Sequence, residues 1–467
     1  MAESGWTPPA QVLRSGRLTW AQHEWVQWIP TDSPTSFEDN ICAAIPGRDM
    51  PREVVVAAVR DVIQRHEGLR TIIERGNGDA ARQHVTPVDA LLDQIIEVTD
   101  QDPEGPRFDT PWRRTCFRIG AEWPIRVVLF QRGTAVRRVD LVVDHVAIDP
   151  WAMNVLCRDL SRAIRSRAAG REPFAAGAPA EQPIDAAEAE VTPAGQAYQR
   201  RAMRHWERRL VRIREGLDGY APRTPPPAPP VPLTEYGGFR SCWLISRRAG
   251  EAAVTLARTT GISASSAFLL AFGAAVCAVE RSPLAGLFAI SANRMSPAAA
   301  GSVRKATMTL PVIIPEVTRD TYAGALAECA AQQLGGHRFA NADPYATERM
   351  CEDILRGLYK TAVAYPRFSY MDESVAGRFS TAWSARTGRS YDDGEVTFAP
   401  PRLLGAKYML TVLHRSEGAV LSLQWSDETH WGEAAESMLR HIEDLMVWAA
   451  YGYPGDMPVL GRDRVAR

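Results

Sequence analysis

The sequence predicts an α+β protein with two lobes of similar content. Apolar residues spaced for helices and for strands follow one another without the regular alternation that a parallel α/β sheet requires. A proline-rich run, PRTPPPAPPVP at residues 222–232, favours a stiff extended segment between the two halves. We therefore expect an N-terminal lobe over residues 1–178, a connector helix with a proline-rich linker over residues 179–235, and a C-terminal lobe over residues 236–467.

Helix and strand patterns follow one another through the N-terminal lobe. The stretch PREVVVAAVRDVIQRHEGLRT, residues 51–71, has the apolar spacing of an amphipathic helix, and its RHE tripeptide is expected on a solvated face. Two strands are predicted in PIRVVLFQRG, residues 124–133, and in VRRVDLVVDHVAI, residues 136–148. A further helix is expected to begin near Trp151.

The connector and the C-terminal lobe show the same two kinds of pattern. In AYQRRAMRHWERRLVRI, residues 197–213, helical spacing places Tyr198, Met203, Trp206 and Leu210 near one face. The remaining elements are two helices over residues 247–280, strands within 284–294, 306–315 and 407–427, and a final helix over 434–452.

The composition is that of a globular protein without a polyanionic partner. The 467 residues are 45% hydrophobic and 23% charged, and the formal net charge is −1. Such a charge gives no general attraction to nucleic acid or to an anionic membrane. No apolar run reaches the roughly 18–20 residues of a membrane-spanning helix, and MAESGWTPPAQV at the N-terminus does not resemble a signal peptide. We expect a cytoplasmic protein that has neither nucleic acid nor membrane as a partner.

The cysteine pattern predicts neither a disulfide framework nor a zinc site. The seven cysteines are scattered, odd in number and without a C-x-x-C pair, and most are expected to be buried. The sequence also lacks the P-loop, G-x-S-x-G, H-E-x-x-H and strand-linked G-x-G-x-x-G motifs. We therefore expect no bound metal or cofactor.

One segment, LVVDHVAIDPWAMNVLCRDL at residues 141–160, places charged residues where a buried strand ends. Under the strand's period of two, His145 shares a face with Leu141 and Val143, and Asp144 points the other way. Asp149 stands where a helix N-cap is expected, and Pro150 follows at the first helical position. These residues fit a plain helix start and a buried core histidine. They also fit a catalytic base, because neighbouring carboxylates can orient an imidazole.

Several motifs resemble those of condensation domains of non-ribosomal peptide synthetases, in the chloramphenicol-acetyltransferase-like superfamily. DHVAIDP, residues 144–150, is in the register of the family's H-H-x-x-x-D-G core, with Asp144 at the first His and Pro150 at the Gly. Five further stretches resemble family motifs in order: LTWAQHEWVQWI (18–29), RHEGLRT (65–71), AYQRRAMRHW (197–206), SANR (291–294) and FSYMD (368–372). The resemblance extends over nearly the whole chain.

The resemblance implies two chloramphenicol-acetyltransferase-like lobes that form a V-shaped pseudo-dimer around a central tunnel. A donor acyl or aminoacyl group would arrive on the phosphopantetheine arm of a separate peptidyl or acyl carrier protein, and an amine or alcohol acceptor would enter from the other side. His145 would act as general base or orient the nucleophile, and Asp144 and Asp149, the acids of the core motif, are expected with it in the catalytic site. Asp149 would be mainly architectural, with Arg294 as its ion-pair partner and Pro150 and Trp151 supporting the site. A free-standing, monomeric enzyme is expected.

Asp144 and Pro150 leave other interpretations open. Heterocyclisation domains carry D-x-x-x-x-D-x-x-S, and Asp144 and Asp149 match both acids, but Ala152 stands where the serine belongs. Pro150 is bulkier than the family's glycine and fixes the backbone, which would narrow the tunnel or remove the activity. The alternatives to condensation are therefore a catalytically silent module that recruits partner enzymes, and a heterocyclisation or other acyl-transfer variant.

Overall fold

The computed structural model describes residues 11–28, 40–76, 80–100, 111–174, 180–219, 239–356, 358, 365–372, 394–399, 408–426, 431–452 and 457–458. These residues form two compact units. Unit 1 contains the described residues up to 197 together with residues 292–307, and unit 2 contains residues 198–291 and the described residues from 308 onward. The compact units do not follow chain order. The chain passes into unit 2 at residue 198, returns to unit 1 over residues 292–307, and passes into unit 2 again at residue 308. The proline-rich run at 222–232 lies outside the described residues.

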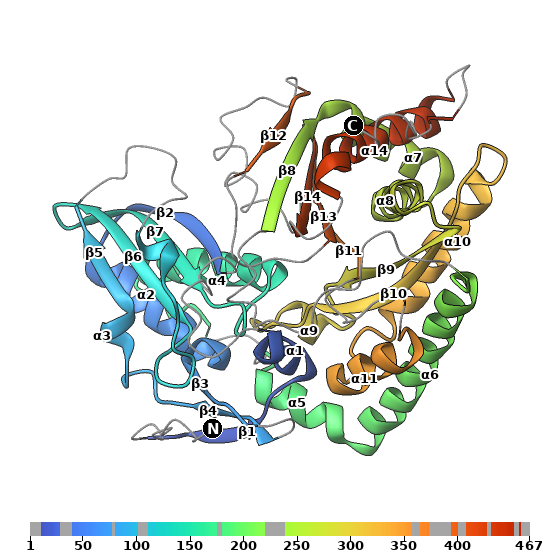
Figure 1. Cartoon of the computed structure of the whole chain (residues 1–467). Helices are drawn as coiled ribbons and strands as arrows, with labels where there is room; N and C mark the ends of the chain where they lie inside the picture. The colour runs from blue at the N-terminus through green and yellow to red at the C-terminus, as the bar shows by residue number, and fades with distance from the viewer. Residues whose placement is uncertain are drawn as a thin grey trace. The chain divides into compact units, whose positions relative to one another are not determined.

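Unit 1 contains a four-stranded sheet with the order β2-β7-β6-β5 and a three-stranded sheet with the order β1-β4-β3 (Figure 1). In the larger sheet β5 and β6 are parallel and the other neighbours are antiparallel. The strands are β1 (Arg14–Arg17), β2 (Ile41–Pro51), β3 (Thr71–Glu74), β4 (Arg82–Val85), β5 (Ile96–Thr99), β6 (Ile125–Arg132) and β7 (Ala135–Val143). The helices are α1 (Trp20–Trp28), α2 (Arg52–Arg65), α3 (Leu92–Ile95), α4 (Pro150–Ala168), α5 (Pro183–Val191) and α9 (Pro297–Ala300), with 3-10 turns η2 (Glu67–Arg70) and η4 (Pro111–Arg114).

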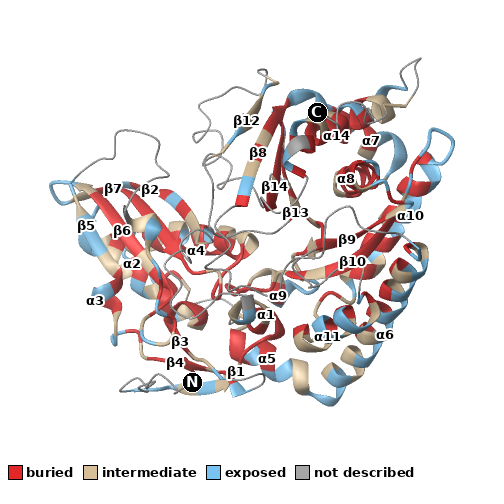
Figure 2. Cartoon of the chain, viewed as in Figure 1, coloured by how far each residue is buried: buried red, intermediate tan, exposed pale blue. Residues whose placement is uncertain are grey.

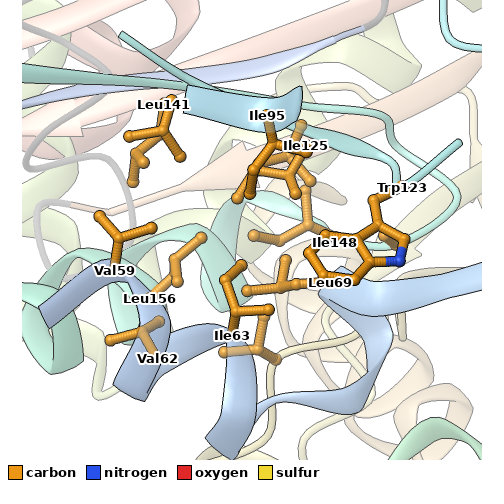
Figure 3. Close-up of a cluster of buried hydrophobic side chains, with 14 of the residues drawn as sticks. Val59, Val62, Ile63, Leu69, Ile95, Trp123, Ile125, Leu141, Ile148 and Leu156 are labelled. Carbon is orange, nitrogen blue, oxygen red and sulfur yellow. The ribbon is translucent and has the colours of Figure 1, made fainter. Parts of the chain in front are cut away.

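The core of unit 1 lies between the larger sheet and the helices α2 and α4. Val59, Val62 and Ile63 of α2 and Leu156 of α4 are buried in one cluster with residues of β6 and β7 (Figure 3). The spacing of the three α2 residues is the helical period that the sequence showed, so its apolar stripe faces the sheet. This packing fixes both helices, and α4 begins immediately after the segment that carries the predicted site.

Unit 2 is built on a seven-stranded mixed sheet with the order β10-β9-β11-β13-β14-β8-β12. Its strands are β8 (Phe239–Ser246), β9 (Leu284–Ser291), β10 (Met308–Pro315), β11 (Arg367–Met371), β12 (Val396–Phe398), β13 (Tyr408–Arg415) and β14 (Gly418–Ser426). Its helices are α6 (Pro193–Gly216, which enters unit 2 at Tyr198), α7 (Arg247–Thr260), α8 (Ala264–Glu280), α10 (Tyr322–His337), α11 (Pro344–Ile354) and α14 (Trp431–Tyr451). Figure 2 shows α8 buried along nearly its whole length, because its sequence is apolar on every side.

The predicted α+β class is confirmed, and the helices and strands named above form among the described residues, except that the helix predicted over 51–71 ends at Arg65 and the strand predicted over 136–148 ends at Val143. The helices α1, α3, α5, α9, α10 and α11 were not predicted, and α5 shows one reason. Residues 170–195 showed no clear apolar period, yet α5 forms there with a capping box between Gln182 and Asp185. Five of the cysteines are buried, and Cys116 is exposed.

No single helix of the described residues combines the length and the apolar character needed to cross a membrane. The pair α7 and α8 passes that test together on length and composition, but the two helices are bent by 115° relative to each other.

Candidate active site

The predicted site lies in the turn between β7 and α4, residues 144–149, which we call the β7–α4 turn. β7 ends at Val143, and residues 145–147 form a turn. The prediction that His145 lies on a strand face beside Val143 is therefore wrong. The cause is Asp144, whose side-chain Oδ1 accepts the N–H of Val146 at 2.7 Å and whose carbonyl accepts the N–H of Ala147 at 3.1 Å. A carboxylate bonded to the backbone two residues ahead starts a turn in place of a strand.

His145 is half-buried, and the turn determines which of its nitrogens carries the proton. Its Nδ1 lies 2.6 Å from the carbonyl oxygen of Ile148. A carbonyl only accepts, so Nδ1 must donate, and in the neutral imidazole the lone pair is on Nε2. The ring of Trp25 in α1 packs against the imidazole, with 4.5 Å between ring centroids and a 50° angle between planes. The turn and Trp25 together set the tautomer and the orientation of the ring.

Asp149 is completely buried and has three kinds of partner. As the N-cap of α4 it accepts the N–H of Ala152 at 2.8 Å, with Pro150 at the first helical position, as predicted. It also accepts the N–H groups of Ala306 and Thr307 at 2.8 and 3.1 Å. Its ion pair with Arg294, at 2.9 Å, is the one that the sequence led us to expect.

The charge of Asp149 is preserved despite its burial. Burial by itself raises the pKa of a carboxyl, but the Arg294 guanidinium and the N–H groups of Ala152 and Ala306 outweigh it and hold the pKa of Asp149 below its ordinary value. Its hydrogen bonds and ion pair show a structural role for this carboxylate at the start of α4.

Arg294 connects Asp149 to the returning segment 292–307. Only 2% of its side chain is exposed. Its Nη1 donates to the carbonyl of Ala299 and to the hydroxyl of Ser302, and its Nη2 donates to the carbonyl of Arg304. Burial lowers the pKa of Arg294 while Asp149 acts in the opposite direction. The segment therefore folds around one guanidinium that is bonded to the N-cap of α4.

A second contact attaches the same segment to α1. Lys305, one of only three lysines in the sequence, places its Nζ 3.0 Å from Glu24 and 3.0 Å from the carbonyl of Thr307. Glu24 precedes Trp25, so residues 292–307 are bonded to the helix that carries Trp25 as well as to Asp149. Neither Trp25 nor Lys305 was among the predicted site residues. For Trp25 the available signal was the likeness of LTWAQHEWVQWI to a family motif.

Pro150 and Trp151 complete the start of α4. Both are half-buried, and Trp151 Nε1 donates to the carbonyl of Ala300 at 2.9 Å. Because the N–H of the first helical residue has no partner within a helix, Pro150 costs α4 no hydrogen bond. Both residues have a structural role here.

A second histidine–aspartate pair joins α2 to α4. We call Arg65, His66 and Asp159 the α2–α4 junction. His66 is 1% exposed, its Nε2 lies 3.0 Å from Asp159, and Arg65 Nε lies 3.2 Å from the same carboxylate oxygen. The expectation of a solvated RHE face is therefore wrong, because α2 ends at Arg65 and the chain turns inward into η2.

Another predicted motif belongs to unit 2. FSYMD belongs to β11 of unit 2, where Tyr370 is hydrogen-bonded to His414 at 2.8 Å. Within the described ranges, no group of three or more His, Cys, Asp or Glu side chains is placed to hold a metal ion. The chemistry available at the turn is that of one oriented imidazole, whose neutral form can accept a proton at Nε2.

Comparison of the sequence with protein-family models gives a match to the condensation domain. The family model of the condensation domain matches residues 18–343. The isonitrile lipopeptide synthase of Mycobacterium tuberculosis (strain ATCC 25618 / H37Rv) is 33% identical over 123 residues, which are 26% of this chain and 5% of that protein. The chain spans 1% to 5% of the length of the curated relatives it matches.

Solved structures share the fold at low sequence identity. One describes condensation domain-mediated chain release from the enacyloxin polyketide synthase; it has a TM-score of 0.66 and 16% identity, and covers 98% of this chain and 86% of that chain. The X-domain in complex with OxyB from teicoplanin biosynthesis has a TM-score of 0.64 and 18% identity, with 99% of this chain and 100% of that chain covered. These likenesses show the chloramphenicol-acetyltransferase-like fold. Since the family model covers well over half of the sequence, the chain belongs to the condensation-domain family of non-ribosomal peptide synthesis.

Proposed function

We propose that this protein joins an acyl or aminoacyl group, carried as a thioester on a carrier protein, to an amine or an alcohol, and so forms an amide or an ester. Membership of the condensation-domain family supports the reaction class. The observation that carries the assignment to His145 is the contact between its Nδ1 and the Ile148 carbonyl, because that contact places the lone pair on Nε2.

In the proposed reaction, the nucleophile's N–H or O–H proton passes to Nε2 of His145 as its nitrogen or oxygen bonds to the thioester carbonyl. The tetrahedral intermediate then expels the thiolate of the phosphopantetheine arm, which takes the proton from the imidazolium. The histidine ends in its starting state, and no oxidant or metal is needed. General-base assistance of this kind contributes about 10²–10⁴-fold to a rate. Asp149 and Arg294 support the turn and take no proton.

A recruitment module without activity is the second candidate, favoured by the departures from the family motif at Asp144 and Pro150. Both residues have local structural roles, since Asp144 accepts the Val146 N–H and Pro150 is the first residue of α4. They therefore leave His145 with a fixed tautomer, which supports the active form. Asp144 and Asp149 are likewise both engaged by backbone N–H groups, which favours condensation over cyclisation.

The test is to incubate the protein with acyl-carrier thioesters and a panel of amines and alcohols, and to follow the products by mass spectrometry. We expect product with the wild type, a loss of about 10²–10⁴-fold in His145→Ala, and retained activity in His84→Gln. His84 is a matched control because it is a hydrogen-bonded histidine of β4 in the same unit. Unchanged turnover in His145→Ala would remove the general-base role. Absence of product from every donor, with stable binding of a carrier, would favour recruitment, and a product lacking a second water would indicate cyclisation.

A further inference from the structure

Helix α6 carries a line of arginines on its solvent side. Arg200, Arg204, Arg208 and Arg212 recur at every fourth residue, and all four are exposed. At a rise of about 1.5 Å per residue, successive members are separated by about 6 Å along the axis. Arg201 is exposed on the same side. The buried residues of α6, including Trp206, lie on the opposite face. We call these five arginines the α6 arginine row.

The row is not neutralised by the part of the protein that the structure describes. Arg200, Arg201, Arg204 and Arg208 make no ion pair within that part, and Arg212 reaches Glu328 only at 3.6 Å with both side chains about half exposed. The helix holds seven arginines and two glutamates in a chain whose net charge is −1. The positive charge is therefore a local property of this helix.

Like charges four residues apart destabilise a helix, so the row lowers the stability of α6. The positive charge also acts on buried groups beside the row. Burial and then the nearby Arg209 and Arg208 lower the pKa of His205 to about 4, and Arg209 has a buried Nη1 without a hydrogen-bond partner. Charged side chains that lower stability and make no ion pair within the described protein are typical of a binding surface, because proteins retain functional residues even where these residues reduce stability.

The residues beside the row favour an acidic protein over a phosphate backbone as its binding partner. Val211, 37% exposed, is an apolar residue on the same helix between Arg208 and Arg212. Glu207 and Glu215 are exposed nearby and would repel a phosphate backbone but could pair with basic residues of a protein. Interfaces between proteins combine an apolar contact with charged surroundings. In a partner helix with a carboxylate at every fourth residue, the carboxylates are about 6 Å apart along the axis, which is the spacing of the arginines in the row.

We propose that the α6 arginine row is the docking surface for an acidic helix of a partner protein. The carboxylates of that helix would pair with Arg200, Arg204, Arg208 and Arg212, and an apolar side chain would cover Val211. This surface belongs to unit 2 and the β7–α4 turn to unit 1, and the proposal does not depend on the reaction at His145.

The test uses a fluorescent peptide of about 18 residues. At a rise of about 1.5 Å per residue, a helix of this length extends somewhat beyond the row. It is stapled as a helix and has glutamate at every fourth position. A peptide of the same composition with shuffled glutamates, a DNA duplex and vesicles of anionic lipid are measured beside it. We expect the regular peptide to bind the wild type most tightly, with an affinity that falls as salt is raised.

Three double variants locate the binding. Arg204→Gln/Arg208→Gln should lower the affinity for the regular peptide by about fivefold or more. The melting temperature of this variant protein should equal or exceed that of the wild type. Arg258→Gln/Arg349→Gln is the matched control, since both residues are exposed on other helices of unit 2. Arg204→Glu/Arg208→Glu should bind a peptide with lysines at the same positions better than the wild type does.

Equal binding of regular and shuffled peptides would overturn the proposal, as would an equal loss in the control variant. Tighter binding of the DNA or the vesicles, lost with the same arginines, would also overturn it and assign the row to a polyanion.

Discussion

The β7–α4 turn and the α2–α4 junction each contain a histidine, but the two histidines have different partners. His66 is buried, and its Nε2 lies against the carboxylate of Asp159. His145 is half-buried, its Nδ1 donates to a backbone carbonyl, and its ring packs on Trp25. A histidine held by a carboxylate in the core serves the packing of two helices. Either partner defines a tautomer, so the difference lies in burial: His145 is half-buried, whereas His66 is enclosed in the core.

The largest expected effect separates Asp149 from His145 within the β7–α4 turn. In Asp149→Ala the Arg294 guanidinium stays buried without its counter-ion, so we expect a loss of about 3–5 kcal/mol in unfolding free energy. His145→Ala removes one hydrogen bond at a half-buried site and should cost about 1 kcal/mol. Chemical denaturation of both variants measures the difference. Equal losses would show that Asp149 is not the support of the turn.

The junction should reveal itself in the pH dependence of stability. Burial lowers the pKa of His66, with Asp159 acting in the opposite direction. The unfolded chain therefore binds the proton first, near pH 6.5, and the unfolding free energy falls as the pH drops below that value and is constant above it for this group. His205 and His441, whose pKa burial lowers to about 4, add slope of the same sign.

We expect His66→Gln to reduce this slope below pH 6.5, by at most about 1.4 kcal/mol per pH unit. Urea titrations at several pH values measure it, and the slope that remains in the variant reports the other buried histidines. A slope identical to that of the wild type would mean that His66 does not resist protonation.

A smaller effect distinguishes a structural Asp144 from a catalytic one. Asp144→Ala leaves the N–H of Val146 buried without its acceptor, which should cost about 1–2 kcal/mol. Asp144→Asn retains an acceptor oxygen, so it should keep both the stability and the condensation rate of the wild type. Denaturation and turnover are measured on the same preparations. A stable but inactive Asp144→Asn protein would instead give this carboxylate a chemical role.

The smallest effect concerns the ring of Trp25. Aromatic pairs contribute about 0.5–1.5 kcal/mol beyond their burial, so Trp25→Leu should lower kcat severalfold through a less ordered His145 while leaving KM nearly unchanged. Trp25→Phe should recover much of the rate because it restores an aromatic face. Steady-state kinetics of the three proteins tests this. An unchanged kcat in Trp25→Leu would show that the ring contact has no part in the reaction.

Local patterns predicted the features that depend on local bonds. The N-cap at Asp149 and the proline after it follow from neighbouring backbone groups, and the stripe of α2 follows from its period. The end of β7 was misplaced because Asp144 can satisfy the Val146 N–H itself, and alternation of polarity does not register that competition.

Contacts between residues far apart in the sequence could not be derived from local patterns. The return of residues 292–307 to unit 1 depends on Arg294 and Lys305, which bond to Asp149 and Glu24 more than a hundred residues earlier. The pairing with Arg294 was available only through resemblance to a family. The burial of His66 depends on Asp159 in another helix, which the period of α2 does not reveal.

The central claim is that the β7–α4 turn fixes the tautomer of His145. Nitrogen NMR of the protein labelled in its histidine rings, with His145→Gln to assign the signals, measures this directly at a pH where the ring is neutral. We predict a protonated Nδ1 and an Nε2 that carries the lone pair. A protonated Nε2 would contradict the hydrogen bond to Ile148 and, with it, the role of His145 as the base.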